Sequence, residues 1–219
     1  MKLHTVAGSP NGRKVEAVIY HLGLDVEIQH HDLFSGELRG APYVAINPNS
    51  KVPTLVDGSF TLWESTAIMQ YLADKAGAES LFPRDARARA DITRWQCWEI
   101  AHFNRAFGTL AFEVVAKAKN NFGERDEYLV RQAQENLARF APVLDAHLTG
   151  REYIVGQTIT LADYSMITFE SYRSLVPFDW ATFKNVNAYF DRVRLADAWV
   201  RASAPVAPAL ARTRATQAA

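Results

Sequence analysis

The chain has 219 residues, of which 48% are apolar, and its 24 basic and 24 acidic residues give a formal net charge of zero. This apolar content is ample for a folded core and argues against a disordered chain. The charge balance gives no electrostatic footprint for nucleic acid or for an anionic membrane, and no apolar run is long enough to cross a bilayer. No leader of charged and then apolar residues is visible, so we expect a cytoplasmic protein without membrane or nucleic-acid partners.

The first part of the chain alternates between strand and helix patterns. Residues 2–6 are predicted to form a strand, residues 12–23 a helix, and residues 25–30 a second strand. A strand–helix–strand order implies two parallel strands joined by a crossover helix. Residues 33–46 are predicted to be a loop that contains one helical turn.

The pattern then changes to a hairpin followed by a helix. Two β-type runs, residues 52–57 and 60–63, flank an Asp-Gly pair, which is the strongest short signal for a hairpin. A helical pattern begins after Glu64 and Ser65, so the sheet has four strands of mixed direction. A carboxylate, a hydroxyl and free N–H groups then meet at one helix N-terminus. They are suited to a small zwitterion that carries both an amine and a carboxylate.

Residues 77–84 break the periodicity with Gly and Pro and are predicted to be a linker. The linker would separate a domain of residues 1–76 from an all-helical domain of residues 85–202. The tail of residues 203–219 is rich in Ala, Pro, Arg and Thr and is predicted to fray.

The helical half contains two long segments, residues 85–119 and 124–148. Pro142 lies inside the second of these patterns and should kink or break the helix. Farther along, Thr160 is predicted to cap a helix, with Asp163 returning the hydrogen bond three residues later.

Other features give little sign of redox or metal chemistry. The only cysteine, Cys97, excludes an internal disulfide and a cysteine zinc site, and we expect it to be a buried small hydrophobe. His30 and His31 are adjacent at a strand end and should point to opposite faces, so no metal site is predicted there.

Two segments together carry a family resemblance. NPNSKVPTLVDG, residues 47–58, followed by ESTAIMQYLA, residues 64–73, closely resembles the glutathione-binding half of the cytosolic glutathione transferases. The resemblance runs from the first strand to about residue 202. It implies an α/β thioredoxin-like N-terminal domain (βαβ-ββα), an all-α C-terminal domain and a homodimer.

The resemblance also implies roles for individual residues. In the family the proline at Pro53 is cis, and the backbone of Val52 pairs with the cysteinyl backbone of glutathione. Glu64 and Ser65 would hold the γ-glutamyl amine and carboxylate, while Lys51 would lie near the glycine carboxylate.

The same resemblance places the catalytic group on the Ser-Pro-Asn-Gly loop after the first strand. In the family, a side chain on this loop donates a hydrogen bond to the glutathione sulfur and favours the thiolate, which is the nucleophile. Ser9 has the position of the serine-type, theta-like enzymes and is the expected principal donor. Asn11 is the alternative, because the loop resembles the Thr-Pro-Asn-Gly loop of bacterial nu-class proteins. From spacing alone, these residues would be only a turn that caps a helix.

Further contacts follow from the resemblance. Leu33, after the second strand, is a candidate contact for the tripeptide, and His102, Arg105 and Phe107 are candidates for the pocket of a second substrate.

The implied enzyme is a glutathione S-transferase with a role in detoxification. It would activate the thiol of glutathione, its co-substrate, for attack on an electrophilic and mostly apolar small molecule, without a metal. Two alternatives stay open. One is a glutathione-dependent disulfide reductase in which a second glutathione resolves the mixed disulfide. The other is a non-catalytic member that binds glutathione or a protein.

Overall fold

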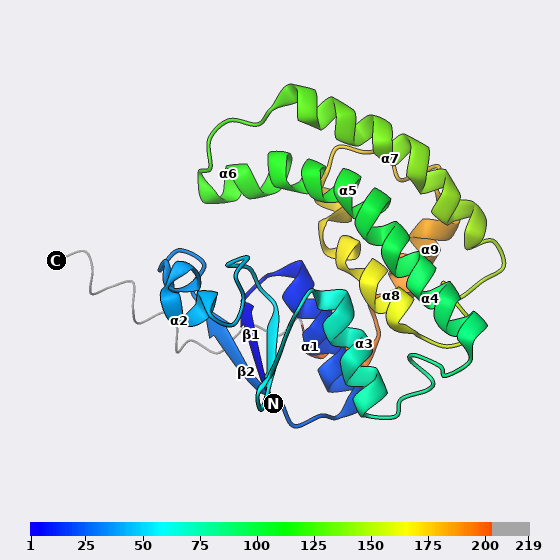
Figure 1. The fold of residues 1–219 in the computed structure, drawn as a ribbon. Helices are drawn as coiled ribbons and strands as arrows, with labels where there is room; N and C mark the ends of the chain where they lie inside the picture. The colour runs from blue at the N-terminus through cyan, green and yellow to red at the C-terminus, as the bar shows by residue number, and fades with distance from the viewer. Residues whose placement is uncertain (203–219) are drawn as a thin grey trace. The chain divides into compact units, whose positions relative to one another are not determined.

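The structure is a computed structural model that describes residues 1–202, so the prediction of a frayed tail lies outside the described residues. These residues form two compact units. The first contains Met1–Leu72 and the described residues from Asp197 on, and the second contains Ala73–Ala196. Figure 1 shows the helices and strands of each unit.

The first unit is built on a four-stranded sheet in the order β2-β1-β3-β4. Its strands are β1 (Lys2–Val6), β2 (Glu27–His31), β3 (Thr54–Asp57) and β4 (Phe60–Trp63). β1 runs parallel to β2, and β3 runs antiparallel to both β1 and β4. The mixed sheet predicted from the sequence is therefore confirmed.

Helix α1 (Pro10–Leu22) begins two residues earlier than predicted, because Ser9 caps it and a proline is tolerated in the first turn. The helix ends at Gly23, whose φ of 61° gives a left-handed cap. A methyl group added at Gly12 would lie 2.0 Å from the Thr5 hydroxyl oxygen, so only glycine lets α1 approach β1 this closely.

The other helices of this unit cover the sheet. Residues 33–46 contain a 3₁₀ turn, η1 (Glu37–Arg39), and the short helix α2 (Ala41–Val44), which is more helix than the sequence predicts. α1 and α3 (Ser65–Lys75) lie on one side of the sheet and α2 on the other (Figure 1). The fully buried side chains between these layers include Leu3, Val18, Leu55, Ile68, Met69 and Leu72.

The last described helix, α10 (Asp197–Arg201), packs against α1. The Arg13 guanidinium lies 3.6 Å from the centre of the Trp199 ring, and Trp199 is buried. A cation over an aromatic face gives a directional contact in addition to apolar burial. The chain thus returns to the first unit after the helical unit is complete.

The second unit is helical throughout its regular structure. Its elements are α4 (Ala86–Trp98), the π-helical turn η2 (Glu99–Phe103), α5 (Asn104–Ala111), the π-helical turn η3 (Phe112–Ala116), α6 (Lys117–Asn120), α7 (Glu127–His147), α8 (Leu161–Met166), the 3₁₀ helix η4 (Ile167–Leu175) and α9 (Lys184–Val193). The segment predicted at 85–119 is one continuous helical run that contains two π turns. α7 stays helical through the exposed Pro142, so the chain does not break there.

A buried carboxylate joins three segments of the second unit. Asp163 accepts hydrogen bonds from the Thr160 N–H at 2.8 Å and the Thr160 hydroxyl at 3.0 Å, as the predicted cap requires. It also accepts from the Ile154 N–H and the Tyr189 hydroxyl, both at 3.0 Å. Burial nevertheless raises the pKa of Asp163 to about 6. Asp163 therefore ties α8 to α9 and to the loop before α8.

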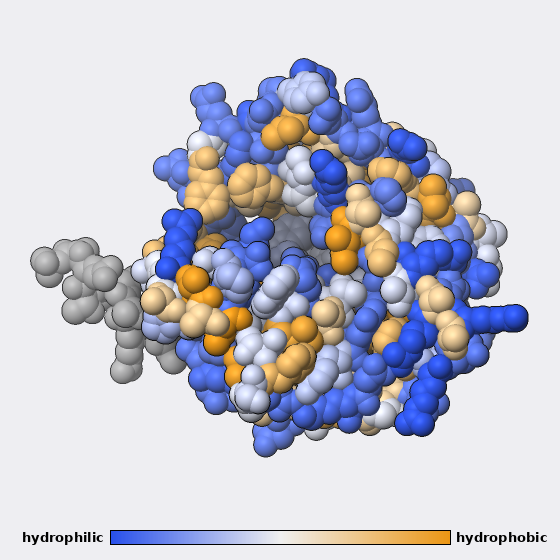
Figure 2. Space-filling view, viewed as in Figure 1, coloured by the Kyte–Doolittle hydropathy of each residue, from blue (hydrophilic) through white to orange (hydrophobic). Residues whose placement is uncertain are grey.

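Cys97 is exposed, so the expectation that it is buried is wrong. Its neighbour Trp95 is buried, and two residues along an α-helix correspond to about 200°, which turns Cys97 away from the core. The face drawn in Figure 2 is mainly hydrophilic, with apolar residues dispersed in small groups. None of the described helices is long and apolar enough to cross a membrane.

Candidate functional site

A polar pocket of about 200 Å³ lies within the first unit. Three segments meet there: the first turn of α1, the loop that leads into β3, and the start of α3. The residues that line it are Asn11, Asn47, Asn49, Lys51, Val52, Pro53, Glu64 and Ser65. Six of the predicted glutathione-binding residues are thus brought together, whereas Ser9 and Leu33 do not line the pocket, and Leu33 is 54% exposed.

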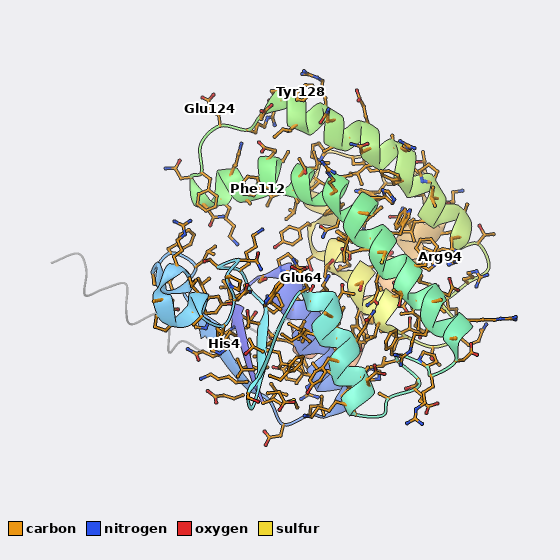
Figure 3. All side chains as sticks on the ribbon, in the orientation of Figure 1. His4, Glu64, Arg94, Phe112, Glu124 and Tyr128 are labelled. Carbon is orange, nitrogen blue, oxygen red and sulfur yellow. The ribbon has the colours of Figure 1, made fainter. Side chains whose placement is uncertain are left out.

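The start of α3 combines a negative carboxylate with the partial positive charge of a helix N-terminus, and a zwitterion can bind to both. Figure 3 labels Glu64 at the N-terminal end of this helix, directly before the mostly buried Ser65. The N–H groups of the first helical turn and the helix dipole favour a bound carboxylate. The Glu64 carboxylate can accept hydrogen bonds from an ammonium group. Glu64 has a left-handed φ of 72°, an uncommon conformation for a non-glycine residue, and such conformations cluster at functional sites.

The loop before β3 presents an unpaired stretch of backbone. The Val52–Pro53 peptide bond is cis, as the resemblance implies. Among the described residues, no hydrogen bond occupies the Val52 amide or carbonyl. Such a backbone can pair with an extended peptide as a neighbouring strand would.

Asn11 faces this pocket from the first turn of α1. The Ser65 hydroxyl donates a long hydrogen bond of 3.4 Å to the Asn11 side-chain oxygen. Because the side-chain oxygen of Asn11 accepts this hydrogen bond, its side-chain NH₂ group points away from the Ser65 hydroxyl. This NH₂ group has two hydrogen-bond donors. The partial positive charge of the helix N-terminus is close by. Asn11 is therefore a hydrogen-bond donor placed for an anion.

Ser9 has a structural contact instead. Its hydroxyl oxygen accepts the Gly12 N–H at 3.2 Å and so caps α1. This is the helix cap that spacing alone predicted. The same hydroxyl keeps its own proton, so a second role as a donor is compatible with the cap.

Sequence reasoning missed three residues around the pocket: Tyr43, Asn47 and Asn49. Asn47 is 2% exposed, and its amide bonds to the Lys51 carbonyl at 2.8 Å. Asn49 donates to the Asn47 side-chain oxygen from its backbone at 3.0 Å and from its side chain at 3.1 Å. The Asn-Pro pair at residues 47–48 is a turn signal, and such a signal does not indicate that the asparagine side chain points inward.

The candidates for a second-substrate pocket lie on η2 and α5 of the helical unit. Phe107 is buried among Phe103, Phe169 and Trp180, with ring centres 5.1 to 6.2 Å away. His102 is exposed, and its ring stacks on Phe140 at 5.0 Å. Arg105 is also exposed. Within this unit, Phe107 is therefore a core residue, while His102 and Arg105 are on the surface.

His31 of β2 is hydrogen-bonded through both of its ring nitrogens. His31 contacts the Glu37 carboxylate and His4, each through a ring nitrogen at 2.9 Å. Across residues 1–202, no three His, Cys, Asp or Glu side chains are arranged to hold a metal ion.

Two family models match the chain. The model for the glutathione S-transferase N-terminal domain matches residues 3–80, and the model for the C-terminal domain matches residues 100–195. The N-terminal match includes every residue that lines the pocket.

Individual relatives agree with these matches. Glutathione S-transferase 3 of Zea mays is 36% identical over 165 residues, which are 74% of this chain and 73% of the relative. Glutathione S-transferase F10 of Arabidopsis thaliana is 29% identical over 89% of this chain and 92% of its own. The glutathione-bound structure of the theta-class enzyme from Xanthomonas axonopodis pv. citri has a TM-score of 0.82 at 28% identity, covering 94% of this chain and 97% of that one. The chain therefore belongs to the cytosolic glutathione S-transferase superfamily and is an enzyme of the glutathione S-transferase type.

Proposed function

We propose that this enzyme binds glutathione in the pocket of its first unit and activates the thiol for attack on an electrophilic, mostly apolar small molecule. The observation that carries the proposal is the convergence of a carboxylate, a helix N-terminus and an unpaired backbone stretch in one pocket. Glutathione has an ammonium and two carboxylates at its ends and peptide groups between them, so each part has a partner here.

The tripeptide is oriented by four contacts in this proposal. Glu64 accepts from the γ-glutamyl ammonium, while Ser65 and the first turn of α3 hold the adjacent carboxylate. Val52 pairs with the cysteinyl backbone. Lys51 lines the pocket with an exposed side chain, which can reach the glycine carboxylate.

Asn11 is the proposed principal donor to the sulfur, ahead of Ser9. A free thiol has a pKa of about 8.5, and a donor aimed at the sulfur favours its charged form. Asn11 lines the pocket with its NH₂ group available, whereas the Ser9 oxygen caps α1. The donor acts on glutathione, which is the nucleophile.

Glutathione-dependent disulfide reduction is the second candidate function. Asn11 in the pocket supports it, because this loop resembles that of the nu-class proteins. Cys97, the only cysteine, belongs to the other unit. A second glutathione thiolate would then attack the mixed disulfide of glutathione and substrate. Oxidised glutathione forms, and the substrate leaves as its thiolate.

The family also supports proposals about assembly, location and biological role. A homodimer, a cytoplasmic location and a role in detoxification are usual for this family. We also propose that His102 and Arg105 contact the second substrate, because both side chains are exposed.

The test compares the wild type with Asn11→Ala and Ser9→Ala on an aromatic electrophile and on a small mixed disulfide of glutathione. We expect Asn11→Ala to lower conjugation by about tenfold to a hundredfold at saturating glutathione, because a hydrogen bond to the thiolate is lost. Ser9→Ala should lower the rate less and lower the free energy of unfolding by about 1 kcal/mol, because a helix cap is lost.

Unchanged conjugation in Asn11→Ala would contradict the role of Asn11. Disulfide reduction that exceeds conjugation and depends on Asn11 would establish the reductase instead. Binding of glutathione without turnover of either substrate would contradict both and favour a binding protein.

A further inference from the structure

The Lys51 carbonyl is held by two buried side chains. The Tyr43 hydroxyl donates to it at 2.7 Å, and the Asn47 amide donates to it at 2.8 Å. A carbonyl oxygen has two lone pairs, and Tyr43 and Asn47 are its two near donors, while the Thr54 hydroxyl is a weaker third donor at 3.5 Å. Tyr43 is 5% exposed and Asn47 is 2% exposed, which means that the carbonyl points into the interior of the first unit.

The direction of this carbonyl sets the direction of the next amide. Lys51 and Val52 share one planar peptide group, and the only cis bond among the described residues is the one between Val52 and Pro53. In a planar trans peptide, the C=O and the N–H point in opposite directions. An inward Lys51 carbonyl therefore directs the Val52 N–H outward, on the side where Val52 lines the pocket.

The two donors are themselves held in place. The Tyr43 ring makes edge contacts with His4 and His31, with ring centres at 5.9 and 5.5 Å. Burial raises the pKa of Tyr43, so its hydroxyl keeps the proton that it donates. Asn47 has its side-chain oxygen occupied by two donors from Asn49, which fixes which end of the amide faces Lys51.

A third group completes the cluster. The fully buried Thr54 hydroxyl lies 3.0 Å from the Tyr43 hydroxyl and 2.9 Å from the Asn47 amide nitrogen. Thr54 is the first residue of β3, so the sheet supports both donors directly. The arrangement is rigid because each member is buried and hydrogen-bonded.

We propose that Tyr43 and Asn47 are positioning residues for glutathione: they hold the Lys51 carbonyl inward and so aim the Val52 N–H at the bound peptide. This inference rests on the proposed function for its ligand, but the orientation of the amide belongs to the unliganded protein. Neither side chain needs to touch the sulfur. Their loss should therefore weaken glutathione binding without changing the chemical step.

The experiment uses Tyr43→Phe, which removes one hydroxyl, Asn47→Asp, which removes the donor and keeps the acceptor, and the double variant. Isothermal titration with glutathione should give a Kd about threefold higher for each single variant, because one donor still holds the carbonyl. The double variant should be weaker by about thirtyfold. KM for glutathione should rise in parallel, while kcat at saturating glutathione stays within about twofold of the wild type.

Tyr71→Phe is the matched control. It removes a hydroxyl of the same unit that donates to Asp57 at 2.6 Å, away from the pocket-lining residues. We expect Tyr71→Phe to leave Kd unchanged even where it lowers the melting temperature. A general loss of stability would instead raise Kd in all variants alike.

The residual dipolar coupling of the Val52 N–H, measured without ligand, separates this inference from the proposed function. We expect the coupling to match the structure in the wild type and to change in the double variant. An unchanged coupling, or a fall in kcat with Kd unchanged, would overturn the positioning role. Failure of the wild type to bind glutathione would overturn the proposed ligand and hence the role in binding it, whatever the coupling shows.

Discussion

The residues of the pocket divide into those that face its interior and those that support them. Asn11, Glu64 and Val52 present a donor, a carboxylate and a free peptide group to the pocket. Behind them, Tyr43 and Asn47 are almost fully buried and hydrogen-bonded to the backbone of the loop. The two groups should therefore respond differently to substitution. A change to a residue that faces the pocket removes a ligand contact directly. A change to a buried residue behind it alters the orientation of the groups that contact the ligand.

The proposed contact between Glu64 and the γ-glutamyl ammonium can be tested by substitution. Glu64→Gln keeps the shape of the side chain and removes its charge, so the γ-glutamyl ammonium loses a charge-assisted hydrogen bond of about 1.5 to 3 kcal/mol. We expect isothermal titration to show glutathione binding weakened by about tenfold or more.

A shorter ligand provides the control for Glu64. The dipeptide cysteinylglycine lacks the γ-glutamyl group, so its weaker affinity should be the same in Glu64→Gln and in the wild type. Equal weakening of both ligands would mean that the substitution disturbs the pocket in general, which would contradict the assigned contact.

Some of these residues could be predicted from the sequence and others could not. Val52, Pro53, Glu64 and Ser65 lie within a few positions of one another along the chain, and their order carries the resemblance. The choice between neighbouring residues of one loop was harder. Ser9 and Asn11 are two positions apart, and which of them faces the pocket depends on where α1 begins.

At the scale of elements, α1 shows how closely sequence and packing are matched. Gly12 allows contact with Thr5 of β1, and Ser9 and Gly23 define the two ends of the helix. The same helix places Glu16 on its buried face. Burial raises the pKa of Glu16 to about 7, against the opposing effects of the nearby Thr5 hydroxyl and of the positive charge of Arg13.

Glu16 therefore makes stability depend on pH. A carboxyl whose pKa is higher in the folded state than in the unfolded state binds more protons when folded. The stability that it contributes is complete below the unfolded pKa and is lost as pH rises toward the folded value. For Glu16 this window runs from 4.5 to about 7. We expect the free energy of unfolding of Glu16→Gln, relative to the wild type, to rise by about 2 kcal/mol across it, allowing for partial hydration of the side chain.

Urea denaturation at several pH values measures this effect. Glu27→Gln is the control, because Glu27 is an exposed carboxylate of β2 in an ion pair with Lys2. The assignment would fail if the wild type and Glu16→Gln changed in parallel between pH 4.5 and 7.

Element types were easier to predict than their details. The hairpin and the long helices follow from periodicity and turn residues, and α7 keeps its apolar face despite Pro142. The two π turns, η2 and η3, were not predicted. Each adds one residue to a turn without a distinctive composition, so the sequence pattern contains no signal for it.

At the scale of the whole molecule, the chain forms two compact units, and its last described helix belongs to the first of them. Arg13 and Trp199, which join α1 to α10, are 186 positions apart. A contact across such a separation depends on the complete fold, and local pattern gives no indication of it. The family resemblance predicted the sheet and the helical half correctly, because both are common to the superfamily.

The second unit has its own structural centre in Asp163, which is buried and accepts four hydrogen bonds. It stabilises the fold of that unit, whereas the chemistry proposed for glutathione depends on the first unit. The central claim therefore concerns one pocket and one thiol.

The most direct test of that claim is the pKa of the glutathione thiol when bound, followed through the ultraviolet absorbance of the thiolate in a pH titration. In the wild type we expect it to lie below the value of about 8.5 for a free thiol, and in Asn11→Ala to return most of the way to it. Ser9→Ala should keep most of the decrease. A bound thiol with an unshifted pKa in the wild type, or an equal decrease in Asn11→Ala, would contradict the account.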